Sequence, residues 1–359
     1  MSIFIDYQKA FDAVNHSILL RKLEKYGVRG NTLNLFKDYL TNRYQSVRIG
    51  EVVSGEKEIK IGVPQGSVMG SLLFIIYIND FPNISNSMHC TMYADDTTVS
   101  FKNASVSELY ADCNETMVKV YNWMISNRLS INMDKTCYML LTTRKCDFNN
   151  DVYISSNVIK RETCVKFLGI MFDDNMKFKS HFTYLSGKIS KTVGILNRIK
   201  DFVPYSTMIT LYNSLIYPYL LYCNLVWGGT FHTNLAALVI LQKKAIRIIH
   251  HKPYGSHTKP LFFQSKLLNL FDIHNYLLGI YMYNAETSEF TRTHLHYTRN
   301  RDQLLPRFHR LALSQKSISY SGPIFWNSLP NEVKTCRSLN TFKSNLKKYL
   351  ISKYMLVEI

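Results

Sequence analysis

Closely spaced cysteine pairs are missing from this sequence. Its seven cysteines are scattered, odd in number and never spaced as Cys-x-x-Cys, so neither a disulfide framework nor a zinc site is predicted. A signal peptide is also not expected, because Asp6 and Lys9 interrupt the first ten residues before an apolar stretch can develop. Together these absences favour a reducing, intracellular compartment.

Long hydrophobic runs are absent as well. No Asp, Glu, Lys or Arg occurs from Phe202 to Gln242, but Asn213, Pro218 and Gly228 interrupt that segment. No run approaches the roughly 18 to 20 apolar residues that a spanning helix needs. Buried helices are predicted here, and also in the uncharged stretch 62–79, so we expect no membrane partner.

Acidic residues are scarce in the second half of the chain. Residues 1–175 hold 19 Lys and Arg against 19 Asp and Glu, whereas residues 176–359 hold 24 against 7, so the whole net charge of +17 lies in the second half. Such a surplus favours binding to a polyanion, with nucleic acid as the first candidate. A basic surface that only keeps the protein in solution remains the alternative.

The pattern of elements predicts an α+β fold. Short strands and helices alternate up to about residue 175, with helices over 16–27 and 105–128. A hairpin is predicted around Ser54 and Gly55, and a second one over 90–101. Beyond Met176 the pattern is mostly helical, which indicates a second, basic unit.

Three acids fall at the ends of predicted strands. Asp6 ends an apolar strand, and Asp95 and Asp96 lie at the tip of the second hairpin. An antiparallel sheet that pairs these strands would bring three carboxylates together, where two hard divalent ions can support in-line displacement at phosphorus. Taken singly, the same acids are also compatible with a solvated strand end and ordinary turn chemistry.

The order of five segments favours the interpretation of these acids as a metal site. These segments are "FIDYQKAFDAVNH", "GVPQGSVMGSLLFIIYIND", "MYADDTTVS", "INMDKT" and "VKFLGIMFD". In this order they resemble motifs A, B, C and D and the primer-grip region of reverse transcriptases of non-LTR (LINE-type, jockey-like) retrotransposons. The segments "SLIYPYLLYCNLVWGG", "LQKKAIRII" and "FWNSLP" resemble the region that follows the polymerase in those elements.

The resemblance implies a domain organisation. Residues 1–175 would form a polymerase palm, an antiparallel sheet with helices, that includes the primer-grip region. Residues 176–253 would form a basic, helical, thumb-like domain, and residues 254–359 a helical C-terminal post-polymerase region. Since the chain begins five residues before Asp6, we expect the upstream fingers region to be missing, together with an endonuclease and a C-terminal Cys/His cluster.

The resemblance also implies roles for the acids and for Lys135. Asp6, Asp95 and Asp96 would be the catalytic acids that bind two Mg²⁺ ions, for which Mn²⁺ is a possible substitute. Lys135 would meet the phosphates or donate a proton to the departing pyrophosphate. Without the resemblance, Lys135 would be interpreted as a surface charge.

Five further residues correspond to nucleotide and primer contacts in the family. Phe11 would lie under the incoming sugar and exclude a 2′-hydroxyl, although a core aromatic is the simpler interpretation. Gln65 and Gly66 would abut the nucleotide and the template base, and Gly66 is also compatible with a tight turn before a helix. Leu168 and Gly169 would form the turn that positions the primer end.

The basic half would then bind the template–primer duplex through its phosphates. The candidate contacts are Lys188, Lys191, Arg198, Lys200, Lys243, Lys244 and Arg247. Charge runs of this kind are also typical of solvated helix faces.

The predicted function is therefore that of an RNA-directed DNA polymerase. It would extend a DNA primer along an RNA template with deoxynucleoside triphosphates. A truncated, catalytically inactive remnant that only binds nucleic acid is the alternative. The family implies a location in the nucleus or in a cytoplasmic ribonucleoprotein, and the sequence leaves the oligomeric state open.

Overall fold

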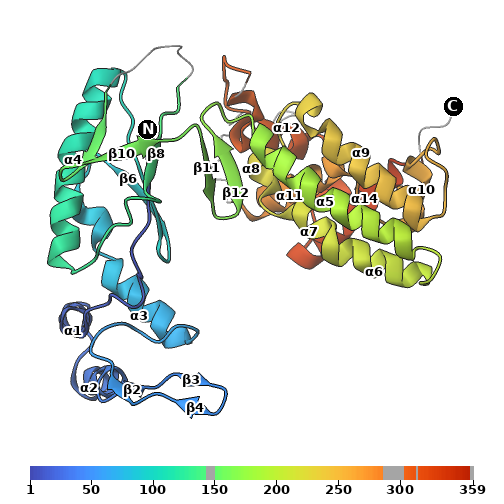
Figure 1. Cartoon of the computed structure of the whole chain (residues 1–359). Coiled ribbons are helices and arrows are strands. Elements are labelled where there is room, and N and C mark those ends of the chain that lie inside the picture. The colour runs from blue at the N-terminus through green and yellow to red at the C-terminus, as the bar shows by residue number, and fades with distance from the viewer. Residues whose placement is uncertain (143–149, 286–302, 313, 356–359) are drawn as a thin grey trace. The chain divides into compact units, whose positions relative to one another are not determined.

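The computed structural model describes residues 1–142, 150–285, 303–312 and 314–355. It divides into two compact units, Met1–Gly169 and Ile170–Ile359, and each is described by itself. Unit 1 combines a sheet with helices, whereas unit 2 is built mostly from helices (Figure 1). The predicted α+β class is confirmed.

A six-stranded sheet forms the centre of unit 1, in the order β6-β7-β1-β8-β10-β9. These strands are β1 (Ser2–Ile5), β6 (His89–Tyr93), β7 (Asp96–Ser100), β8 (Cys137–Met139), β9 (Val152–Ile154) and β10 (Asn157–Arg161). β1 is antiparallel to both of its neighbours, β7 and β8, while β10 runs parallel to β8. The sheet is therefore mixed, although the part that carries the candidate acids is antiparallel.

The register between β1 and β7 decides where the acids lie. Phe4 pairs with Thr98 and Ile5 pairs with Thr97, so Asp6 and Asp96 follow directly at the end of this pairing. Ile3 and Ile5 are buried, because alternate side chains of a strand point to the same face of the sheet. The hydrophobic core therefore fixes the register that brings Asp6 to the hairpin.

Helices and short strand pairs complete unit 1. The helices are α1 (His16–Lys25), α2 (Gly30–Leu40), α3 (Val68–Ile78), η1 (Phe81–Ile84) and α4 (Val106–Ser126). Two pairs of short antiparallel strands are β2 (Tyr44–Gln45) with β5 (Lys57–Glu58) and β3 (Arg48–Ile49) with β4 (Val52–Val53). The helices predicted over 16–27 and 105–128 are confirmed as α1 and α4.

The hairpin predicted around Ser54 and Gly55 is placed wrongly. Ile49 pairs with Val52, so the chain turns at Gly50, whose φ of 61° lies in the left-handed region that glycine adopts at low cost. Ser54 instead follows β4, and its hydroxyl accepts a hydrogen bond from the N–H of Val47 at 2.9 Å. Gly50 and Gly55 are both turn signals and lie five residues apart, and the pairing of β3 with β4 places the turn at Gly50.

Unit 1 ends with β11 (Cys164–Phe167), and unit 2 starts with β12 (Ile170–Asp173). Its helices are α5 (Lys179–Ile199), α6 (Tyr205–Leu215), α7 (Tyr217–Leu221), α8 (Asn224–Trp227), α9 (His232–Ile249), α10 (Lys259–Ser265), α11 (Leu270–Asn284), η3 (Ser314–Lys316), α12 (Ile318–Asn327), α13 (Asn331–Lys334) and α14 (Leu339–Ser352). The uncharged segment 202–242 lies largely in α6 to α9, as predicted. No helix among the described residues is both long and apolar enough to span a membrane.

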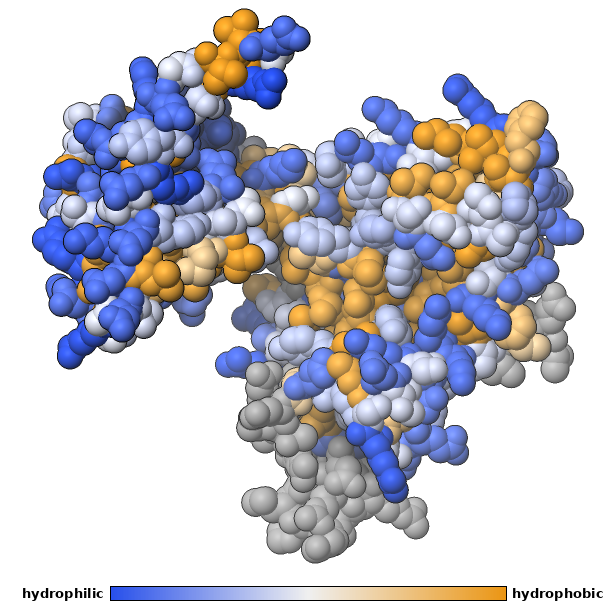
Figure 2. Space-filling view, turned by 90° about the horizontal axis from the view of Figure 1, so that it is seen from below, coloured by the Kyte–Doolittle hydropathy of each residue, from blue (hydrophilic) through white to orange (hydrophobic). Residues whose placement is uncertain are grey.

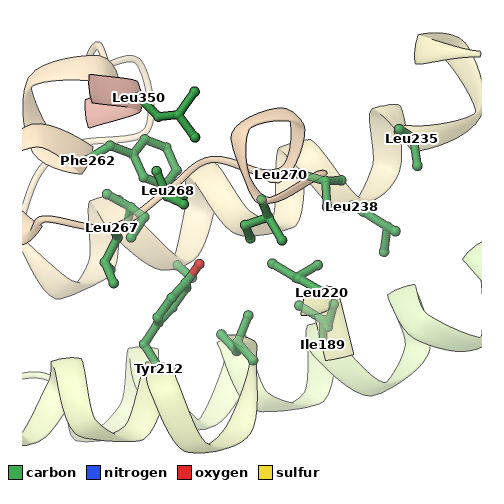
Figure 3. Close-up of a cluster of buried hydrophobic side chains, with 14 of the residues drawn as sticks. Ile189, Tyr212, Leu220, Leu235, Leu238, Phe262, Leu267, Leu268, Leu270 and Leu350 are labelled. Atoms are coloured by element: carbon green, nitrogen blue, oxygen red, sulfur yellow. The ribbon is translucent and has the colours of Figure 1, made fainter. Parts of the chain in front are cut away.

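One hydrophobic cluster holds unit 2 together. Side chains such as Ile189, Tyr212, Leu238 and Leu350 converge from different helices in Figure 3. The buried amide of Gln242 lies at this core, where it donates to the Tyr212 hydroxyl and to the Leu268 carbonyl and accepts from the N–H of Leu270. Since each of these bonds is made inside the core, the polar group links α6, α9 and α11 without an unpaired atom.

The cluster draws residues from both 176–253 and 254–359. Within the described residues these two segments therefore share one core, and their division into thumb-like and post-polymerase regions stays a prediction.

The surface mixes hydrophobic and hydrophilic side chains, as the face in Figure 2 shows. Several large hydrophobic side chains are exposed, among them Phe202 at 85% and Ile49 at 77%.

Candidate functional site

The tip of the β6–β7 hairpin carries two of the predicted acids. Tyr93 pairs with Asp96 as the last pair of the ladder, so Ala94 and Asp95 form the connection. Ala94 has a φ of 52°, which closes the turn in two residues. The predicted hairpin is confirmed, and both Asp95 and Asp96 are exposed at its tip.

Asp6 is held beside the turn that carries Lys135. The N–H of Asp6 donates to the Thr136 hydroxyl at 3.2 Å, and the N–H of Asn132 donates to the Asp6 carbonyl at 2.8 Å. Lys135 Nζ lies 3.8 Å from Asp6 Oδ2. Sequence reasoning placed these two residues in separate motifs, and the structure brings them together as an ion pair.

Burial and neighbouring carboxylates determine the electrostatics of Asp96 at this end of the sheet. Burial raises the pKa of Asp96, and the neighbouring charges of Asp95 and Asp6 raise it further. Such repulsion between carboxylates is the condition under which a cation stabilises a site.

A preassembled metal centre is not found in the described part of the chain. No group of three or more His, Cys, Asp or Glu side chains there is placed to hold a metal ion. The donor set nevertheless fits magnesium, which prefers carboxylate oxygens. Assignment of Asp6, Asp95 and Asp96 as metal ligands stays a prediction.

The loop before α3 is fastened to the segment that follows Asp6. The N–H of Val63 donates to the Phe11 carbonyl at 2.9 Å, and the N–H of Gly62 donates to the Val14 carbonyl at 2.7 Å. Gly62 has a φ of 90°, and a Cβ there would lie only 2.9 Å from the Asp12 carbonyl oxygen. The close approach of these two segments therefore requires glycine.

This arrangement places Gln65 against Asp12. Gln65 Nε2 donates to Asp12 Oδ1 at 2.9 Å, across 53 residues of sequence. Sequence reasoning selected Gln65 and missed Asp12, although Asp12 lies inside the quoted motif A segment, one residue after Phe11.

Gly66 and Phe11 fit their simpler interpretations as well as the predicted ones. Gly66 has a φ of 82° and a Cβ there would meet no heavy atom within 4 Å, so the turn alone explains the glycine. The ring of Phe11 is half-buried, with its centre 4.7 Å from that of Phe74 on α3. Phe11 thus packs partly in the core and keeps part of its surface exposed.

A cavity of about 630 Å³ opens beside Asp6 in unit 1. Its lining includes Asp6, Tyr7, Asp12, Asn132 and Lys135. Tyr7 is a second residue that sequence reasoning missed, and the Thr97 hydroxyl donates to its hydroxyl at 3.4 Å. Burial raises the pKa of Tyr7, with a smaller contribution from the charge of Asp95, so the phenol stays protonated.

Leu168 and Gly169 form a turn, and their role at the primer end stays a prediction. Their φ angles are 45° and 81°, and they connect β11 to β12. A leucine in the left-handed region is uncommon and costs energy. Near this turn, the ring centres of Phe167 and Phe4 lie 5.5 Å apart, which links β11 to the central strand of the sheet.

The predicted basic residues occupy two helices of unit 2. Lys188, Lys191 and Arg198 lie on α5, Lys200 caps its end, and Lys243, Lys244 and Arg247 lie on α9. The two helices pack against each other. Most of these side chains are exposed, which is compatible with phosphate contacts and with a solvated face.

Comparison with known proteins gives one family match. Residues 1–172 match the family described as "Reverse transcriptase (RNA-dependent DNA polymerase)".

Curated relatives extend this similarity beyond residue 172. The chain is 26% identical over 279 residues to a probable RNA-directed DNA polymerase from transposon X-element of Drosophila melanogaster, which covers 76% of this chain and 30% of that protein. It is 28% identical over 272 residues to the RNA-directed DNA polymerase from mobile element jockey of Drosophila funebris, covering 72% of this chain and 29% of the relative. The chain therefore spans less than a third of the length of these relatives.

Proposed function

We propose that this chain, whose residues 1–172 match the reverse transcriptase family, carries the RNA-directed DNA polymerase activity of a jockey-like non-LTR retrotransposon. The observation that carries the proposal is the β1–β7 register, which brings Asp6 to the hairpin tip with Asp95 and Asp96. At this tip the pKa of Asp96 is raised mainly by burial and further by the charges of Asp95 and Asp6.

The reaction proposed is transfer of a nucleotide to the 3′-hydroxyl of a primer. Asp6, Asp95 and Asp96 would hold Mg²⁺, or Mn²⁺ in its place, which when bound activates the hydroxyl and neutralises the leaving pyrophosphate. Lys135 lies 3.8 Å from Asp6 and is exposed, so its ammonium can exchange the carboxylate for a phosphate oxygen. From there it can donate a proton to the pyrophosphate as it departs.

Nucleotide selection would depend on two segments that backbone hydrogen bonds hold together, namely the loop before α3 and the segment that follows Asp6. Gln65 is oriented by Asp12, and we assign Asp12 as a positioning residue that fixes the Gln65 amide against the incoming nucleotide. Phe11 would exclude a 2′-hydroxyl with the exposed part of its ring. The turn at Leu168 and Gly169 would support the primer end.

The proposed partners are an RNA template, a DNA primer and deoxynucleoside triphosphates. The basic residues of α5 and α9 would bind the phosphates of the template–primer duplex, which makes the affinity depend on salt. The nucleus or a cytoplasmic ribonucleoprotein is the compartment in which such a protein would act.

A catalytically inactive remnant that binds nucleic acid is the second candidate. It is favoured by the lack of a preassembled three-residue metal site in the described residues. In that case the basic unit would keep its function while the acids would have lost theirs.

Primer extension on an RNA template, with deoxynucleotides and Mg²⁺, distinguishes the two. We expect wild-type extension, a loss of about 1,000-fold in Asp6→Asn, which corresponds to about 4 kcal/mol, and an unchanged rate in Asp38→Asn. Asp38 is exposed on α2 and its substitution removes the same charge. Salt-sensitive duplex binding without wild-type extension would favour the remnant, and absence of both would contradict both candidates.

A further inference from the structure

A second cavity, of about 690 Å³, lies wholly within unit 2. Its walls come from α9, from α10 with the residues before it, and from the residues that follow α14 (Figure 1 shows these helices). The lining includes Lys243, His257, Lys259, Phe263 and Tyr354. Of these residues, only Lys243 has a role in the proposed polymerase, as one of the contacts to the phosphates of the template–primer duplex.

The charges around this cavity are unbalanced. Lys243 and Lys259 form no ion pair with any described residue, and no described carboxylate lines the cavity. Asp272, which is bonded to the lining residue Tyr354, accepts hydrogen bonds from the Tyr354 hydroxyl and from Asn269. The carboxylate of Asp272 is therefore already hydrogen-bonded, and Lys243 and Lys259 remain available to an anionic ligand.

Aromatic side chains accompany these cations. Phe263 is 37% exposed, and Tyr254 is 74% exposed. The Arg247 guanidinium lies 5.5 Å from the ring centre of Tyr254, and Arg247 Nε donates to the carbonyl of Ser256 at 2.8 Å. Ser256 directly precedes His257 of the lining, so this cation–aromatic pair lies next to the cavity along the chain.

We propose that this cavity binds a nucleotide of a single-stranded nucleic acid, with Lys243 and Lys259 on the backbone phosphate and Phe263 stacked on the base. Unpaired cations around a hollow with an exposed aromatic ring are the combination by which single strands are bound without sequence preference. The Arg247–Tyr254 pair would receive the neighbouring nucleotide. A duplex keeps its bases stacked inside, so it cannot use Phe263 in this way. The inference goes beyond the proposed polymerase, because it needs neither the acids nor a nucleoside triphosphate.

Fluorescence anisotropy with a labelled single-stranded RNA of about twelve nucleotides tests the site in the full chain, with no Mg²⁺ or nucleotide added. The test variant is Lys243→Gln/Lys259→Gln. The matched control is Lys347→Gln/Lys348→Gln, which removes the same charge from exposed positions of α14. We expect affinity to fall about tenfold in the test variant and less than about threefold in the control. The slope of log affinity against log salt concentration should be less steep by about 1.4 in the test variant, because two phosphate contacts to a single strand are lost.

Stacking is tested separately by Phe263→Ala and Phe263→Tyr. We expect Phe263→Ala to weaken single-strand binding about tenfold and Phe263→Tyr to retain it, while affinity for a blunt duplex is unchanged by either. Equal losses in the two lysine variants would show a diffuse electrostatic surface and overturn the proposal. Equal losses for duplex and single strand in Phe263→Ala would overturn it as well. Since extension is not measured, neither result depends on polymerase activity.

Discussion

The two units differ in how their charged residues are arranged. In unit 1 positive and negative charges balance, and the important acids are fixed by the register of a few paired strands. In unit 2 the surplus of positive charge is spread over helices that share one apolar core. We therefore expect single residues to dominate the chemistry of unit 1, whereas unit 2 should act through a sum of smaller contacts.

The largest expected effect is the loss of stability when the core of unit 2 is disturbed, and its measurement shows whether the two units unfold independently. Leu238 is fully buried in the core of unit 2, so Leu238→Ala should cost about 2 to 5 kcal/mol of its unfolding free energy. Calorimetry should show one transition lowered by several degrees and the transition of unit 1 unchanged. Leu215→Ala, at a position 39% exposed on α6, is the control. A common shift of both transitions would show one cooperative unit and break the comparison.

Sugar selection is the next effect in size. Phe11→Val removes part of a ring that is packed on Phe74, and we expect the relative use of ribonucleotides to rise by about 10- to 100-fold. Extension with each nucleotide type measures this ratio. Phe36→Val, at a half-buried position of α2, should leave the ratio unchanged. An unchanged ratio in Phe11→Val would mean that Phe11 is only a core residue.

A smaller effect is expected for the hydrogen bond between Asp12 and Gln65. Asp12→Ala should raise KM for the nucleotide about fivefold, as expected for the loss of about 1 kcal/mol, with a smaller change in kcat. Asp12→Asn keeps an acceptor oxygen and should behave like the wild type. Steady-state kinetics separates the two parameters, and an equal fall in kcat for both variants would contradict a positioning role.

The smallest effect concerns the pH dependence of stability. Because the pKa of Asp96 is raised in the folded state, its contribution to stability is present below its unfolded pKa and is lost as the pH rises through the folded value. The ionised carboxylate therefore opposes folding at pH 7, and Asp96→Asn should raise Tm by about 1 °C there. The difference should vanish towards pH 4 in thermal scans. A lower Tm for Asp96→Asn at pH 7 would mean that the charge is already compensated.

The parts of unit 1 that local patterns determine could be predicted from the sequence. The β6–β7 hairpin follows from β-branched residues around a two-residue turn, and an apolar strand that ends in Asp6 pairs with it by its buried face. These short-range rules were sufficient to bring the three acids to one end of a sheet.

Contacts between distant loops could not be predicted in the same way. The bond between Asp12 and Gln65 spans 53 residues and depends on a close approach that only Gly62 permits. The pairing of Lys135 with Asp6 depends on the turn at 132–136, which is fixed by the bond from the Asn132 N–H to the Asp6 carbonyl and by the bond from the Asp6 N–H to the Thr136 hydroxyl. The turn predicted at Ser54 was misplaced for the same reason. Gly50 and Gly55 are turn signals of similar strength, and the pairing of β3 with β4 places the turn at Gly50.

The most direct test of the account is a single-turnover extension of a bound RNA–DNA template–primer, in which binding and chemistry are measured on the same sample. The comparison is between wild type and Asp95→Asn/Asp96→Asn in Mg²⁺. We expect the variant to bind the duplex within about threefold of the wild type and to lose extension by about 1,000-fold. A variant that extends the primer at the wild-type rate, or that loses binding and extension in parallel, would contradict the assignment of catalysis to this end of the sheet.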